Sequence, residues 1–212
     1  MKSNKKTFIL TTLICLIPVI AGIILYPQLP EEIATHWDAN GNANGWQSKL
    51  TGAVINPAIL LVINLAVPFL IRIDPSNKGM NRKVTAMIQW TIPVVSLVCS
   101  GITLATAVGT AVPVEIIMPL LIGIVFIVIG NYLPKVKQSY TIGIKLPWTL
   151  DSEKNWNATH RLAGYLWVVC GLLMIICCFF PWRMTAFFIL LVIMVLVPTV
   201  YSYLFYRRET QS

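Results

Sequence analysis

Residues 114–137 read VEIIMPLLIGIVFIVIGNYLPKVK, an apolar run that ends abruptly at two lysines. Over 114–133 the single charged side chain is Glu115, at the edge of the run. About 20 apolar residues in an α-helix cross the ~30 Å hydrocarbon core of a bilayer. The stretch therefore predicts a membrane-spanning helix that ends just before Lys135 and Lys137.

Five other stretches have a similar length and composition, and none carries a charge in its middle. They cover residues 7–26, 52–73, 84–108, 162–180 and 184–205. The chain of 212 residues is 57% hydrophobic and 11% charged, whereas soluble domains have about 25% charged residues. The sequence therefore predicts an all-α membrane protein, a bundle of about six transmembrane helices. The first run is longer than the ~7–15 residues of a signal-peptide core and lacks a small-residue cleavage site, so we expect it to remain as a span.

Basic residues gather on the connectors of one side of the membrane. With the N-terminus inside, the inner connectors are 1–6, 74–83, 134–161 and 206–212. Together with Arg72 they hold fourteen of the 16 Lys and Arg residues, and only Lys49 and Arg183 fall outside. This bias predicts an N-in/C-in topology. It also explains the net charge of +8 through orientation and contact with anionic lipid, without a direct nucleic-acid partner.

Two connectors are longer than neighbouring helices need, and function is expected there. We name them the outer loop, residues 27–51, and the inner loop, residues 134–161. The predicted organisation is an N-terminal two-helix unit, 1–73, that carries the outer loop. A four-helix unit, 74–212, follows and carries the inner loop.

The outer loop has dense Asn/Gly turn chemistry around Asp38. Its tryptophans, Trp37 and Trp46, are interpreted as headgroup-level anchors. The alternative is a recognition surface, which would also include His36 and Asp38, for something that arrives from outside.

A metal site in the outer loop is not predicted. Residues 38–49 begin like a calcium loop, but Ala43 and Lys49 stand where that loop needs a glycine and a bidentate glutamate. His36 has no second His or Cys nearby.

The inner loop contains a short apolar stretch, 140–146, that is too short to span the membrane. It either lies on the bilayer or dips into the bundle. Asp151 or Ser152 can cap a following helix, on which Trp156 and His160 share a face. This helix is interpreted as an interfacial amphipathic segment, with a docking surface for a cytoplasmic partner as the alternative.

The predicted spans lack ionisable residues in their interiors, which argues against proton- or ion-driven transport. Catalytic motifs are also missing, so no enzyme, catalytic residue or cofactor is predicted. A few polar residues remain, and they indicate either interhelical hydrogen bonds or a polar path for a solute: Asn56, Asn64, Gln89, Ser96, Ser100 and Thr103.

Two glycine pairs repeat at seven-residue spacing, Gly123 with Gly130 and Gly164 with Gly171. Small residues at this period let membrane helices approach closely. We therefore expect these glycines to lie at helix contacts.

The inner loop resembles the SdpI family of bacterial proteins. The resemblance rests on GNYLPKVK at 130–137, YTIGIKLPWTL at 140–150, and Trp156 with the THR triplet at 159–161. The outer LPEEI…HW…GW…K pattern at 29–49 resembles a domain of unknown function that often precedes this family. The candidate inner residues are Asn131, Tyr132, Pro134, Lys135, Lys137, Gly143, Lys145, Pro147, Trp148, Thr149, Trp156, Thr159, His160 and Arg161.

This resemblance implies a non-enzymatic immunity protein in the bacterial cytoplasmic membrane. Such a protein gives resistance to a membrane-active, SdpC-like peptide toxin outside, and it signals the toxin's presence by holding an SdpR-like repressor at the membrane. One alternative is a small facilitator or exporter that uses the polar residues of the spans. Another is a surface enzyme that depends on His160.

Overall fold

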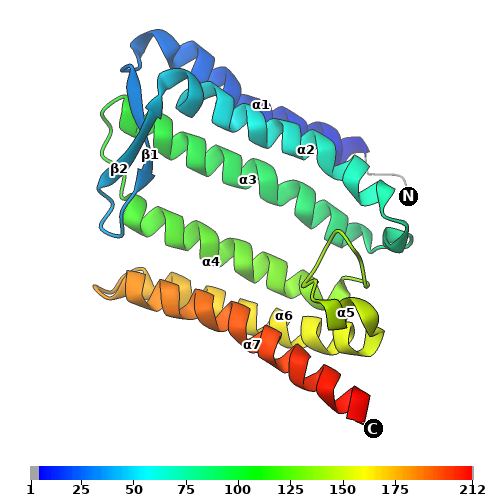
Figure 1. Ribbon diagram of the computed structural model, residues 1–212. Coiled ribbons are helices and arrows are strands. Elements are labelled where there is room, and N and C mark those ends of the chain that lie inside the picture. The colour runs from blue at the N-terminus through cyan, green and yellow to red at the C-terminus, as the bar shows by residue number, and fades with distance from the viewer. Residues whose placement is uncertain (1–4, 212) are drawn as a thin grey trace. The chain divides into compact units, whose positions relative to one another are not determined.

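The computed structural model describes residues 5–211. Within that range six helices are long and apolar enough to cross a membrane (Figure 1), which confirms the predicted fold class. They are α1 (Lys5–Leu25), α2 (Asn56–Ile73), α3 (Arg82–Ala107), α4 (Val114–Tyr132), α6 (Glu153–Cys177) and α7 (Arg183–Gln211). The sixth helix extends beyond its predicted end at 205. The fifth begins at Glu153 rather than at 162, because the predicted capping helix runs directly into the span.

Shorter elements connect these helices. The outer loop contains the 3₁₀ turn η1 (Tyr26–Gln28), the strands β1 (Glu32–Trp37) and β2 (Ala43–Ser48), and the π-helical turn η2 (Thr51–Ile55). The turn η3 (Pro75–Asn77) follows α2. The inner loop contains the turn η4 (Leu133–Lys135) at its start and the short helix α5 (Pro147–Asp151).

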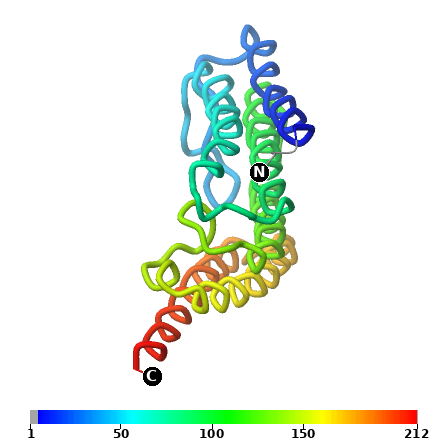
Figure 2. The backbone as a smooth tube through the Cα atoms, turned by 90° about the vertical axis from the view of Figure 1, so that its right-hand side faces the viewer, coloured from blue at the N-terminus to red at the C-terminus, as the bar shows by residue number. Residues whose placement is uncertain are grey.

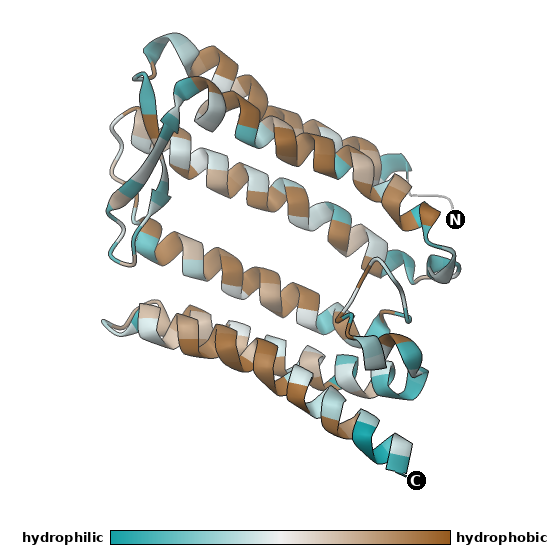
Figure 3. Ribbon diagram, viewed as in Figure 1, coloured by the Kyte–Doolittle hydropathy of each residue, from teal (hydrophilic) through white to brown (hydrophobic). Residues whose placement is uncertain are grey.

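Apolar residues run along the length of the helices (Figure 3), and many of their large side chains are exposed. Ile24 is 66% exposed, Phe69 65% and Val195 62%. Lipid is the solvent that makes such surfaces stable over the length of a helix. The N-in/C-in orientation stays a prediction, and residues 1–4 and 212 of its terminal inner segments lie outside the described residues.

Contacts divide the described chain into two compact units. We call residues 5–69 with 88–121 the hairpin unit, and residues 70–87 with 122–211 the loop unit. The helices α2, α3 and α4 each contribute to both. The predicted division into residues 1–73 and 74–212 separates consecutive stretches of the sequence, whereas these two units are defined by contacts. That division stays a prediction.

The outer loop folds as an antiparallel β-hairpin, which the sequence analysis did not predict. Ala34 pairs with Trp46 and Ile33 with Gln47. Ile33 is 1% exposed and belongs to the core cluster of the hairpin unit, which also contains Leu29, Ala53 and Leu104. A Cβ on Gly52 would lie 2.7 Å from the Ile33 side chain, so the glycine lets β1 pack directly on η2.

In the loop unit, the packing of α6 against α7 centres on Cys170, Met174, Leu190 and Met194. The predicted glycine contacts occur between α4 and α6. A Cβ on Gly123 would lie 2.9 Å from the carbonyl oxygen of Gly171, and one on Gly130 would lie 2.8 Å from that of Gly164. The two antiparallel helices therefore touch backbone to backbone at both glycine pairs.

We expect Gly130→Ala to destabilise the protein by about 1–3 kcal/mol, because the new methyl group overpacks a rigid backbone contact. The matched control is Gly101→Ala in α3, where a Cβ meets nothing within 4 Å. That change should be neutral or slightly stabilising. Thermal unfolding of the two variants in detergent measures the difference, and equal melting temperatures would contradict the proposed contact.

Candidate functional site

The inner loop folds back onto the start of α6 (Figure 2). Trp156 Nε1 donates a hydrogen bond to the carbonyl oxygen of Val136 at 2.8 Å. The backbone N–H of Ile144 donates to His160 Nε2 at 2.9 Å. The Trp156 and His160 rings stack with centroids 3.9 Å apart. These two side chains therefore hold two points of the loop against one helix face.

Both nitrogens of His160 are used in this contact. Nδ1 lies 2.8 Å from the carbonyl oxygen of Trp156, so Nδ1 carries the proton and Nε2 is the acceptor for Ile144. His160 is 1% exposed and Trp156 0%. Neither ring faces lipid or solvent, and the imidazole has no nitrogen free to act as a base or metal ligand. In this geometry His160 has a structural task, which is to hold Ile144 against α6.

Gly143 lies directly on this ring pair with φ of +117°. A Cβ at this position would lie 2.6 Å from His160 Nε2 and 2.7 Å from the Trp156 ring. Glycine is required here both by the backbone conformation and by the close approach.

The other end of the loop is fixed through α5. Thr149 is fully buried, and its hydroxyl lies 2.9 Å from the carbonyl oxygens of both Ile144 and Leu146. Gln138 Nε2 donates to the carbonyl oxygens of Thr149 and Leu150 at 2.9 and 2.8 Å. The loop thus satisfies its own backbone groups from within.

Contacts with α7 fix the junction between α5 and α6. Trp148 Nε1 donates to Ser202 Oγ at 2.7 Å, and Asn155 Nδ2 donates to the Ser202 carbonyl oxygen at 2.9 Å. Thr159 is fully buried and donates to Asn155 Oδ1 at 2.9 Å. Of the two predicted caps for α6, Ser152 is the one that accepts a hydrogen bond, from the Asn155 N–H.

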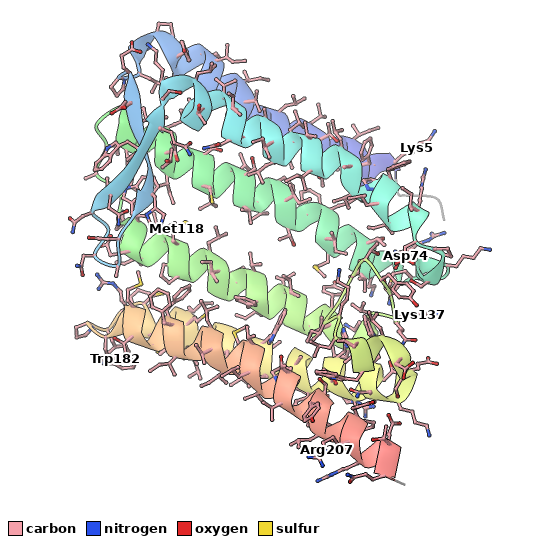
Figure 4. The ribbon with its side chains drawn as sticks, viewed as in Figure 1. Lys5, Asp74, Met118, Lys137, Trp182 and Arg207 are labelled. Carbon is pink, nitrogen blue, oxygen red and sulfur yellow. The ribbon has the colours of Figure 1, made fainter. Side chains whose placement is uncertain are left out.

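A buried carboxylate on the α2–α3 connection completes the site. Asp74 is 6% exposed. Its Oδ1 accepts from the backbone N–H and the hydroxyl of Ser76. Its Oδ2 lies 3.0 Å from the backbone nitrogens of Tyr140 and Thr141 and 3.1 Å from the Ser139 hydroxyl. Figure 4 labels Asp74 and Lys137, which lie at the same end of the loop unit.

These donors decide the ionisation of Asp74. Burial raises the pKa of the carboxyl, but hydrogen bonds from Ser76, Thr141 and Ser139 outweigh it and lower the pKa from 3.8 to about 2. The folded-state pKa is depressed, so the interaction stabilises the fold above pH 3.8, and this contribution is lost as pH falls toward 2. Both carboxylate oxygens are occupied by these donors.

Asp74 and its partners Ser139 and Thr141 were not predicted as site residues from the sequence. One signal was present. Asp74 opens the run Asp-Pro-Ser-Asn, which is typical of a turn in which the Asp side chain accepts from the backbone two residues on. What the sequence could not show is that the same carboxylate also binds residues more than 60 positions later.

The candidate inner residues divide into a buried framework and an exposed set. Thr149, Trp156, Thr159 and His160 are buried, and Tyr132, Gly143 and Trp148 are half-buried. The exposed residues are Asn131, Pro134, Lys135, Lys137, Lys145, Pro147 and Arg161. Four of these seven are cations, so the framework displays a basic surface.

The outer candidates all lie on or beside the hairpin. Trp46 is 56% exposed, and His36 Nδ1 lies 2.6 Å from Asn44 Oδ1. Asp38 closes the turn, because its carboxylate accepts from the backbone N–H groups of Asn42 and Asn40, which lower its pKa. Trp37 is half-buried, so Trp46 is the more accessible of the two indoles. In the described part of the chain, no group of three His, Cys, Asp or Glu side chains could hold a metal ion.

We expect Gly143→Ala to release the loop from α6, because the methyl group would collide with both rings. Gly109→Ala is the matched control, since Gly109 also has a positive φ, +85°, but meets nothing within 4 Å. Hydrogen exchange of residues 142–146 should accelerate at least tenfold in the first variant and stay unchanged in the second. Unchanged exchange in Gly143→Ala would contradict the packing described here.

Comparisons with known proteins find matches over both long loops. A family model described as the SdpI/YfhL protein family matches residues 135–202, and one described as a domain of unknown function (DUF1648) matches residues 13–61. The chain is 30% identical over 214 residues to "Immunity protein SdpI" of Bacillus subtilis (strain 168), across 98% of this chain and 99% of that protein. No solved structure matches. The six apolar helices and this similarity support a multi-pass protein of the cytoplasmic membrane. The chain belongs to the SdpI/YfhL family.

Proposed function

We propose that this chain gives its cell resistance to a membrane-active, SdpC-like peptide toxin and signals the toxin by holding an SdpR-like repressor at the membrane. The observation that carries the resistance half is the similarity to a named immunity protein over nearly the full length of both chains. The signalling half is supported by the rigid inner loop with its basic surface.

The outer hairpin is the proposed toxin-facing surface. It presents Trp46, which is 56% exposed, on β2, and β2 pairs with β1, the strand that Ile33 anchors in the core. An exposed indole combines an apolar face with one N–H donor, which suits an amphipathic peptide at the membrane surface. His36 and Asp38 supply polar groups nearby.

The inner loop is the proposed repressor-facing surface. Its buried framework fixes the backbone, so little conformational entropy is lost when a partner binds. Its exposed cations Lys135, Lys137, Lys145 and Arg161 would attract an acidic protein surface and set the orientation of the complex.

Survival under toxin tests the resistance half. In cells that lack an immunity protein and are challenged with a co-encoded or sister-cell peptide toxin, the wild-type chain should restore growth. Trp46→Ala should lower the tolerated toxin concentration several-fold, because the accessible indole is lost. The matched control is Trp182→Ala, which removes another exposed indole, 52% exposed, from the connection between α6 and α7. Unchanged sensitivity with and without the wild-type chain would overturn this half.

Repressor localisation tests the signalling half. A fluorescent fusion of the co-encoded repressor should move to the membrane when toxin is added to cells that make the wild-type chain. The double variant Lys137→Gln/Lys145→Gln should lose this movement and keep toxin survival, since it removes two exposed cations from the inner loop. Arg208→Gln, an exposed cation near the end of α7, is the control. A fusion that stays in the cytoplasm with the wild-type chain would contradict a signalling role.

The alternative function, a small facilitator, is favoured by one observation in the hairpin unit. Asn64 and Ser96 are fully buried and Gln89 is 5% exposed. Asn64 Nδ2 donates to Thr12 Oγ1, but Asn64 Oδ1, Gln89 Nε2 and Ser96 Oγ have no hydrogen-bond partner in the described residues. Glycerol or urea flux into reconstituted vesicles above the rate of empty vesicles, abolished by Gln89→Leu, would favour this function. Flux equal to that of empty vesicles would count against it.

A further inference from the structure

The α2–α3 connection carries a carboxylate around which part of the inner loop is built. Asp74 follows the last residue of α2, and its loop partners are Ser139, Tyr140 and Thr141. We call Asp74, Asn77, Ser139 and Thr141 the Asp74 clasp. All four residues belong to the loop unit.

The two oxygens of the carboxylate have separate tasks. Oδ1 accepts both hydrogen bonds from Ser76 and so shapes the turn η3. Oδ2 faces the inner loop, where the N–H groups of Tyr140 and Thr141 and the hydroxyls of Ser139 and Thr141 converge at 3.0–3.1 Å. Several donors that converge on one oxygen require a charged acceptor, and such hydrogen bonds are stronger than neutral ones.

A second buried side chain strengthens the same connection. Asn77 is 2% exposed. Its Nδ2 donates to Thr141 Oγ1 at 2.8 Å and to the Ile71 carbonyl oxygen at 3.0 Å. Its Oδ1 lies 2.9 Å from the Ser139 hydroxyl. The end of α2, the turn η3 and residues 139–141 are therefore joined by one hydrogen-bond network.

The clasp fixes the backbone of residues 139–141 but leaves the aromatic side chain of Tyr140 exposed. Tyr140 is bound through its N–H, and its side chain is 69% exposed. Neighbouring Lys137 is also exposed. A fixed backbone that displays an aromatic ring and a cation presents a defined contact surface, whereas a mobile loop would have to be ordered by its partner.

We propose that Asp74 is the positioning residue of the inner loop, which holds residues 139–141 in the shape that the cytoplasmic partner recognises. This inference rests on the proposed docking role of the inner loop and adds the residue on which that role depends. Asp74 itself does not touch the partner.

Asp74→Asn is the direct test, because the two side chains have nearly the same shape. An amide has one acceptor oxygen, so it can serve either Ser76 or the loop but not both. In the full-length protein in lipid nanodiscs, amide exchange of a peptide that contains residues 139–141 should accelerate at least tenfold. Asp74→Glu keeps the charge and should restore part of the protection. Asp151→Asn, which neutralises an exposed carboxylate in the same unit, should leave exchange unchanged.

The functional readout separates positioning from general stability. Asp74→Asn should lose most of the toxin-dependent movement of the repressor fusion while toxin survival stays near the wild-type value, although loss of the charged acceptor lowers the melting temperature. Ser139→Ala, a milder variant that removes one donor to Oδ2, should produce a smaller loss in the same direction. Asp74→Glu should recover part of the movement.

Three results would overturn the inference. The first is wild-type amide exchange in Asp74→Asn. The second is accelerated exchange with undiminished repressor movement, and the third is a joint fall of movement, survival and melting temperature in both Asp74→Asn and Ser139→Ala. If the wild-type chain itself fails to move the repressor, the proposed signalling function fails. The exchange comparison then still decides whether Asp74 fixes the loop.

Discussion

A loop backbone that is buried against helices must find partners for its N–H and C=O groups within the protein, because water does not reach them there. The inner loop meets this requirement with buried side chains from three places in the sequence. Asp74 binds the amides of residues 140 and 141, His160 binds the amide of Ile144, and Trp156 binds the carbonyl oxygen of Val136. The buried residues of the inner motif therefore serve to fix the shape of the loop. Its exposed cations are available for contact with a partner.

The outer loop meets the same requirement with a hairpin. Strand pairing satisfies backbone groups on the facing edges of β1 and β2, and Asp38 accepts from the turn. A salt bridge of 2.8 Å between Lys49 and Glu31 closes the base of the hairpin, although an exposed pair of this kind contributes little stability. Each loop is thus an ordered structure that displays accessible side chains, which is what a recognition surface needs.

Much of the fold could be predicted from the sequence, since hydrocarbon-length apolar runs and glycine periodicity are local patterns. The six spans, glycines at helix contacts and a cap at Asp151 or Ser152 follow from them. The structure adds that the glycines join α4 to α6 and that Ser152 is the cap. The hairpin escaped prediction because β2 carries Asn and Gly, which have little β propensity, and because Ile33 is the one buried residue of the two strands. The Asp74 network could not be predicted because Asp74 and its partners in the inner loop lie more than 60 residues apart in the sequence, and no periodic pattern links them. The family resemblance identified the inner motif but could not separate its buried residues from its exposed ones.

The account depends most on the hairpin and the inner loop facing opposite sides of the membrane. Accessibility of single cysteines to a membrane-impermeant maleimide in intact cells measures this directly. Asn40→Cys in the hairpin turn should react from the medium, and Lys137→Cys in the inner loop should react only after the cells are opened. A reactive position 137 together with a protected position 40 in intact cells would contradict the account.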